Sequence, residues 1–206
     1  MDFSMINQRG LKLKEAFFQR QHPDTIARDL LGKVLVTYRN NVLTSGIIVE
    51  TEAYSFKEKG SHVYNNLYTA RTSIMFECGG VAYVYLCYGI HSMFNIVTNT
   101  KDKAEAVLVR ALQPLDGQTE MRRRANSDSI HRITSGPGKL AKALGIDRTL
   151  NGKHLGGDEV WVEDIGTKIA KYQVVTTSRI GIDYAGDDAH LPWRFYLQDN
   201  PWVSRR

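Results

Sequence analysis

The sequence predicts an α+β fold, a single mixed domain around a curved, open-barrel-like antiparallel β-sheet with peripheral helices and a protruding β-hairpin. Extended runs rich in β-branched and aromatic residues follow one another without long helices between them, which favours antiparallel pairing. Two of these runs are separated only by Gly89-Ile90, a spacing typical of a hairpin. The 206 residues contain no repeat and no low-complexity linker. We therefore expect one domain over residues 1–206.

The first elements are a short helix and two strands. Asp24 is expected to cap a helix that runs through Leu31 and ends at Gly32. Extended runs follow at 33–39 and 43–54, joined by a turn at Asn40-Asn41.

The middle of the chain predicts a hairpin with strands over 81–88 and 91–98, in which Gly89 takes the first central position of a type II′ turn. This register pairs Tyr88 with His91 and Val84 with Asn95. It places Tyr85 and Asn95 on opposite faces of the hairpin, and only a β-bulge would bring them to one pocket. A fifth strand is expected over 105–112.

The last third predicts one more helix and three more strands. Ser135 is a candidate N-cap for a helix with proline in its first turn, and Gly145 ends that helix. The remaining strands are expected over 159–162, 173–176 and 194–197.

Composition excludes several classes of protein. Hydrophobic residues make up 42% and charged residues 24% of the chain, which argues against a disordered, collagenous or coiled-coil protein. No apolar run approaches the roughly 18 residues that span a bilayer, and no secretory signal is visible, so we expect no membrane partner. A reducing interior is the expected location, with Cys78 and Cys87 as free thiols. Phosphate-binding loops, metal-ligand spacings and a nucleophile elbow are all missing from the sequence, so we expect no cofactor and no metal.

The net charge of +5 is concentrated in one stretch. Residues 121–153 contain eight Lys or Arg and two acids. Such a stretch is typical of a surface that binds a phosphate backbone, and a solvated charged loop is the alternative.

Two groups of residues are candidates for chemistry. Strand alternation over 46–54 places Ile48, Glu50, Glu52 and Tyr54 on one face, where two neighbouring carboxylates could tune a general base. Ion pairing on a solvated face is the alternative. Tyrosines gathered in and near the hairpin could build a stacking pocket for a planar base or could simply form core. Tyr88, beside the tight turn, suits a wedge inserted into a duplex, although a packed turn residue is the commoner role.

The chain resembles the alkyladenine (3-methyladenine) DNA glycosylase family. The matching runs, in order along most of the chain, are ARDLLGKVLV (27–36), IVETEAY (48–54), AYVYLCYG (82–89), FNIV (94–97), VRAL (109–112), SGPGKL (135–140) and RFY with PWVS (194–196 and 201–204). The resemblance implies a curved antiparallel fold and removal of alkylated or deaminated purines from duplex DNA by base flipping. The chain departs from the family at residues 55–60, which include two lysines where many members are acidic, and at residues 77–80, which lack the usual proline.

The resemblance also assigns roles to residues. Glu52 matches the general base that activates water, and Arg110 matches a residue near that water and the target phosphate. The residues that match the base-contacting positions are Tyr54, His62, Tyr85 and Asn95. Tyr88 matches the intercalating tyrosine, and Lys139 and Arg148 lie in the matching basic region.

These observations predict a monofunctional DNA glycosylase without lyase activity that acts on 3-methyladenine, 7-methylguanine, hypoxanthine and ethenoadenine as a class. It is expected to act as a monomer on double-stranded DNA, in the cytoplasm with the nucleoid in a bacterium or in the nucleus of a eukaryote. A non-catalytic nucleic-acid-binding β protein is the alternative. A sugar hydrolase that uses Glu50 and Glu52 is less favoured, since both lie on one strand.

Overall fold

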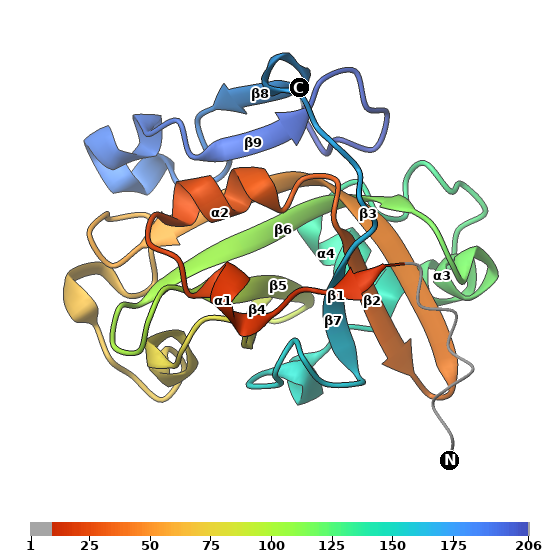
Figure 1. Cartoon of the computed structure of the whole chain (residues 1–206), viewed down its shortest axis with the longest axis horizontal. Helices are drawn as coiled ribbons and strands as arrows, with labels where there is room; N and C mark the ends of the chain where they lie inside the picture. Colours follow the sequence, from red (N-terminus) through yellow and green to blue (C-terminus); the bar gives the residue numbers. More distant parts are fainter. Residues whose placement is uncertain (1–9, 206) are drawn as a thin grey trace.

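The computed structural model describes residues 10–205 and centres on an antiparallel sheet (Figure 1). Seven strands lie side by side in the order β1-β7-β2-β3-β6-β5-β4, and β9 pairs with β3 and β8. The sheet curls into a half barrel, which confirms the predicted α+β fold. The strands are β1 (Leu11–Lys12), β2 (Val34–Arg39), β3 (Val42–Ser55), β4 (Ala82–Cys87), β5 (His91–Thr98), β6 (Glu105–Pro114), β7 (Val160–Asp164), β8 (Val174–Thr177) and β9 (Arg194–Leu197).

Within residues 10–205, four α-helices lie around the sheet: α1 (Glu15–Phe18), α2 (Pro23–Asp29), α3 (Gln118–Ala125) and α4 (Pro137–Leu144). In Figure 1, α2 crosses in front of the sheet near β6, and α4 lies behind it. The Thr51 hydroxyl of β3 donates to the Ala27 carbonyl of α2 over 2.8 Å, and this hydrogen bond links the helix to the central strand. Helices α1 and α3 were not predicted, because α1 is a single turn and α3 buries only Met121.

Both expected helix caps are wrong. The N-cap of α2 is His22, and Asp24 lies within the first turn. The N-cap of α4 is Gly136, whose φ of 140° suits glycine, and Pro137 takes the first helical position. The Ser135 hydroxyl instead donates to the Arg132 carbonyl.

The central strand β3 has three neighbours. Its first half pairs with β2, residues 50–52 pair with β9, and β6 runs along its other edge. The pairing with β6 is irregular: Val49 of β3 and Arg110 of β6 have no partner in the ladder. Bulges of this kind bend a strand and re-aim its side chains. Glu50 and Glu52 therefore lie in the middle of the sheet between two other strands.

This irregularity changes the face of β3 on which Ile48 lies. Ile48 was expected to share a face with Glu50, but it packs in the main hydrophobic core together with Ala53. The unpaired Val49 explains the difference, since one extra residue reverses the alternation of side chains on its N-terminal side.

The main hydrophobic core contains residues of α2, α4 and most strands. A second cluster includes Val63, Met75, Val81, Tyr83 and Ala106, with Tyr85 packed against it. Part of the predicted tyrosine group therefore belongs to the core, and this second cluster forms the floor beneath the candidate site.

The hairpin register differs from the prediction. Cys87 pairs with His91 and Tyr83 pairs with Asn95, so the connection has three residues, 88–90, in place of two. Tyr88 and Gly89 both adopt positive φ, 51° and 73°. The longer turn brings Tyr83, Tyr85 and Asn95 to one face without any bulge.

Gly79 is a site of close backbone approach. A Cβ added there would lie 2.5 Å from the carbonyl oxygen of Phe18, where α1 ends. We predict that Gly79→Ala lowers the free energy of unfolding by about 1–3 kcal/mol, because the backbone must shift to relieve the overlap. Urea denaturation measures the effect, with Gly156→Ala as control, since an added Cβ at Gly156 meets nothing within 4 Å. Equal stability of the two variants would contradict this packing.

Candidate active site

Two carboxylates of β3 share one arginine of β6. Glu50 and Glu52 have no exposed surface. Arg110 donates from Nε to Glu50 Oε1 over 3.1 Å and from Nη1 to Glu52 Oε2 over 3.0 Å. The predicted common face of the carboxylates is confirmed, and the alternative of a solvated face is wrong. The pair is buried and ion-paired at the same time.

Glu50 accepts four hydrogen bonds in all. Its Oε1 also accepts from Arg194 Nε at 2.8 Å and from the Ser204 hydroxyl at 2.9 Å, and its Oε2 accepts from the Ser204 amide at 2.7 Å. Three of these bonds end on Oε1 and one on Oε2, and apart from Arg110 their donors belong to β9 and the C-terminal segment. Glu50 is therefore built as a structural link between β3, β6, β9 and the C-terminal segment.

Glu52 accepts fewer bonds. Besides Arg110, it accepts from the Tyr54 hydroxyl at 2.8 Å and from the backbone amide of Ile180 at 2.8 Å. One of its roughly four acceptor sites is therefore unused by the described residues. Its Oε1 accepts only the Ile180 amide and so has room for one further donor such as a water.

The neighbours of Glu52 keep their protons. Burial, followed by the charge of Glu52 and the hydrogen bond to it, raises the pKa of Tyr54 well above its usual value. Burial by itself lowers the pKa of Arg110, but the charges of Glu52 and Glu50 outweigh it and raise that pKa. Both groups therefore remain donors to the carboxylate at neutral pH.

A groove opens above this pair. Tyr54 and Arg110 line it, and its other walls come from the hairpin and from residues 180–184. The groove encloses about 410 Å³, within the usual range for ligand sites. It leads to an inner pocket lined by four residues that the sequence singled out: Tyr54, His62, Tyr85 and Asn95.

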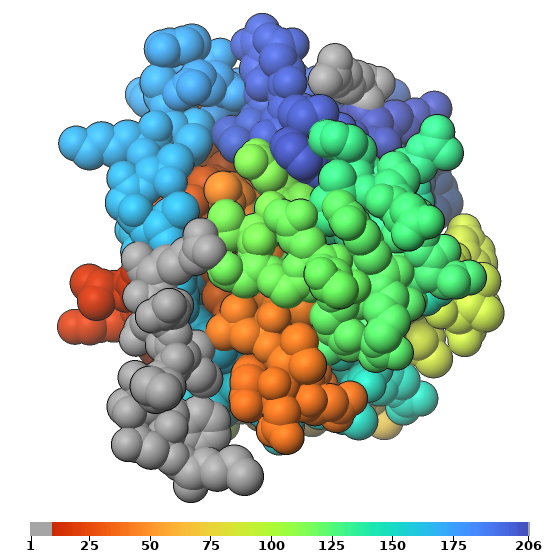
Figure 2. Space-filling view, turned by 90° about the vertical axis from the view of Figure 1, so that its right-hand side faces the viewer, coloured from red at the N-terminus to blue at the C-terminus, as the bar shows by residue number. Residues whose placement is uncertain are grey.

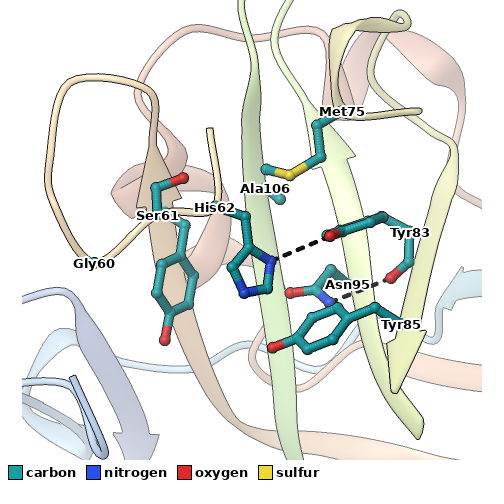
Figure 3. A pocket seen from close by; sticks show the side chains of 9 residues that line it. Gly60, Ser61, His62, Met75, Tyr83, Tyr85, Asn95 and Ala106 are labelled. Atoms are coloured by element: carbon teal, nitrogen blue, oxygen red, sulfur yellow. Dashed lines mark hydrogen bonds between the residues drawn. The ribbon is translucent and has the colours of Figure 1, made fainter. Parts of the chain in front are cut away.

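The inner pocket is held by hydrogen bonds to Tyr83 (Figure 3). The His62 ring lies 3.1 Å from the Tyr83 hydroxyl through Nδ1, and the Asn95 amide donates to the Tyr83 carbonyl over 3.2 Å. The rings of His62 and Tyr85 meet edge to face at 4.6 Å between centroids. Figure 3 shows these side chains converging from the hairpin strands and from the turn after Gly60.

His62 is neutral at physiological pH. Burial, together with the nearby Arg71 cation, lowers the pKa of His62 to about 4. Arg71 Nη2 lies 3.4 Å from His62 Nε2. Because a guanidinium only donates, Nε2 accepts, and the ring proton sits on Nδ1 facing Tyr83.

Tyr88 lies at the tip of the hairpin and is 92% exposed. The alternative of a packed turn residue is wrong for this side chain. Ile90, on the other side of Gly89, is also largely exposed. The tip therefore presents an unpaired aromatic ring to solvent at the rim of the groove.

Lys139 and Arg148 are both exposed. Lys139 belongs to α4, which packs on β5, and Arg148 begins a short 3-10 turn beside β4. Pro137 at the start of α4 lines the groove, while Arg148 lines a neighbouring hollow together with Arg71.

The basic stretch is less uniform than its sequence indicates. Figure 2 shows α3 and the residues after it, in shades of green, on one face of the molecule. On α3, Glu120 pairs with Arg123 at 2.6 Å and with Arg124 at 2.8 Å, and Lys153 pairs with Glu159. Five members are exposed and form no ion pair with another described residue: Arg122, Arg132, Lys139, Lys142 and Arg148.

Sequence reasoning missed the contribution of residues 179–184. Ile180 holds Glu52 through its amide, and Arg179 makes a two-pronged ion pair with Glu58 at 2.7 and 2.8 Å. The Arg179 guanidinium also lies over the Tyr54 ring at 4.7 Å. A backbone amide carries no side-chain signature, so no pattern could have identified Ile180.

Among residues 10–205, no group of three or more His, Cys, Asp or Glu side chains is arranged to hold a metal ion. In the same range, no helix is long and apolar enough to cross a membrane. Cys78 and Cys87 are free thiols, as expected.

The lowered pKa of His62 predicts a pH-dependent stability. Between about pH 4 and 6.5 the unfolded chain holds more protons on His62 than the folded chain, so its contribution to stability falls as the pH falls through this window. We predict that His62→Gln flattens this part of the dependence in urea denaturation at a series of pH values. The exposed His154→Gln serves as control. A His62 ring that titrates near its ordinary value would contradict the assignment.

Comparison with known proteins identifies the family of the chain. The Methylpurine-DNA glycosylase (MPG) family profile matches residues 16–201. Proteins named "Putative 3-methyladenine DNA glycosylase" from Alkaliphilus oremlandii and Natranaerobius thermophilus are 44% and 42% identical, over 95% and 94% of this chain and 100% and 99% of their own lengths. A protein of the same name from Desulfitobacterium hafniense is 40% identical over 87% of the chain and 92% of its own length. The chain belongs to the methylpurine-DNA glycosylase family, whose members are DNA repair hydrolases.

Proposed function

We propose that the protein flips damaged purines out of duplex DNA and cleaves their N-glycosidic bond with a water activated by Glu52. Its substrates are alkylated or deaminated purines, the class that contains 3-methyladenine, 7-methylguanine, hypoxanthine and ethenoadenine. The observation that carries the proposal is the unequal use of two adjacent buried carboxylates. Glu50 accepts four hydrogen bonds, three of them from Arg194 and Ser204, which do not line the groove, whereas Glu52 accepts three, all from residues that line it.

Glu52 is suited to act on a water at an anomeric carbon. Its ionised form is held by Arg110 and by the Ile180 amide, so the carboxylate is pre-oriented before substrate arrives. Glu52 itself has no exposed surface, and the reactive water must enter through the groove that Tyr54 and Arg110 line. The same negative charge stabilises the sugar cation that develops as the base leaves.

The aromatic walls fit a flipped purine. Tyr54 and Tyr85 both line the groove and the inner pocket, where a planar base would stack. Neutral His62 offers a ring beside the pocket without adding charge. Asn95, held by the Tyr83 carbonyl, lies where it would crowd a purine 2-amino group.

The described residues that line the groove and the inner pocket include no lysine. A lyase step needs an amine that forms a Schiff base at the sugar carbon, so the lining supports hydrolysis alone. We propose a monofunctional enzyme that acts as a monomer where the DNA lies, with the nucleoid of a bacterium or in a eukaryotic nucleus.

Glu52→Gln tests the catalytic assignment. We predict that the substitution reduces single-turnover release of hypoxanthine or methylated purine from a duplex by at least about 100-fold, in line with loss of a general base. Duplex binding is expected to stay nearly unchanged, and the exposed Glu15→Gln serves as control. Normal release by a folded Glu52→Gln variant would contradict the catalytic role of Glu52. No release by the unsubstituted chain would instead favour a non-catalytic DNA-binding protein.

Tyr88→Ala tests the wedge. Removing a ring that fills the gap left by a flipped base is expected to weaken duplex binding and slow excision by about 10-fold, at unchanged stability. Tyr172→Ala is the matched control, since Tyr172 is 82% exposed and does not line the groove. Equal binding and excision by both variants would show that the hairpin tip does not enter the DNA.

A further inference from the structure

Arg71 lies at the mouth of the candidate active site with its charge uncompensated. It lines both the groove and the neighbouring hollow, and it is exposed. Its guanidinium carbon is 4.8 Å from the centroid of the Tyr85 ring, and its Nη2 is 3.4 Å from His62 Nε2. No acidic residue among the described part of the chain forms an ion pair with it.

The two aromatic walls of the site are therefore unequal in charge. Tyr54 also has a guanidinium over its ring, that of Arg179 at 4.7 Å. The charge of Arg179 is compensated, because its Nη1 and Nη2 both donate to the Glu58 carboxylate. The Tyr85 wall has an arginine at almost the same distance and no carboxylate. A base held between the walls meets one neutralised cation and one free cation.

A free cation at this position acts differently on different bases. A purine methylated at N3 or N7 is positively charged in DNA, so it is repelled by Arg71 and must share with it the attraction of the Tyr85 ring. A deaminated purine such as hypoxanthine is neutral and experiences no such repulsion. Its exocyclic oxygen can also accept a hydrogen bond from a guanidinium.

We propose that Arg71 is a specificity-determining residue that shifts the preference of this site from cationic alkylated purines toward neutral damaged purines. The inference rests on the proposed function, because it assumes that the groove receives the flipped base. It adds a residue that distinguishes two kinds of substrate at that site by their charge.

The test is the ratio of excision rates for two lesions. Single-turnover release is measured from duplexes of one sequence that carry either 7-methylguanine or hypoxanthine, for the unsubstituted chain, Arg71→Gln and Arg71→Lys. We expect Arg71→Gln to raise the ratio of 7-methylguanine to hypoxanthine release by at least about 3-fold, the scale of one exposed cation–π contact. Arg71→Lys keeps the charge and is expected to keep most of the ratio.

Arg28→Gln is the matched control. Arg28 is also exposed and lies 4.9 Å over an aromatic ring, that of Phe195, but it does not line the groove. Its substitution is expected to leave the ratio unchanged. An equal fall in both rates on Arg71→Gln, with a weaker salt dependence of binding, would identify a phosphate contact and overturn the proposal. An unchanged ratio would also overturn it, whereas failure of the unsubstituted chain to release either base would instead contradict the proposed function.

Discussion

The arginine shared between Glu50 and Glu52 is the interaction on which the site depends. Two carboxylates without exposed surface are stable at the centre of a sheet only because Arg110 and Arg194 compensate their charge from the strands on either side. Loss of one partner from such a buried network leaves an uncompensated charge, which costs about 3–5 kcal/mol. The two carboxylates also have different partners, since Glu50 links the strands to the C-terminal segment while Glu52 is bonded only to residues that line the groove.

The remaining parts of the site are placed relative to this network. Residue 180 reaches Glu52 through its amide, and the Arg179–Glu58 pair fixes the same segment to the turn that leads to His62. On the other side, the hairpin brings Tyr85 and Asn95 to the inner pocket and leaves Tyr88 at the rim. Segments far apart in sequence therefore meet around Glu52. The Tyr85 wall of the pocket also has a positive charge beside it, that of Arg71, which no described carboxylate compensates.

Local sequence rules predicted much of the sheet and the common face of Glu50 and Glu52, because strand alternation depends only on neighbouring residues. They failed where one residue changes a register: the three-residue turn at 88–90 and the unpaired Val49 each reverse a face. Contacts such as Ile180 with Glu52 depend on tertiary packing and have no local signal. The basic stretch was overestimated because Glu120, one residue outside it, neutralises part of α3. The resemblance of the chain to DNA glycosylases identified pocket residues that strand periodicity could not identify.

The most direct test of the assigned roles of the two carboxylates is a crystal structure of the protein bound to a duplex whose damaged nucleotide carries a 2′-fluorine, which slows cleavage of the glycosidic bond. The account predicts the base between Tyr54 and Tyr85, and an ordered water within hydrogen-bond distance of Glu52 that faces the anomeric carbon. Glu50 should keep its bonds to Arg110, Arg194 and Ser204. A flipped base whose anomeric carbon lies beyond the reach of any water on Glu52, or a water held by Glu50, would contradict it.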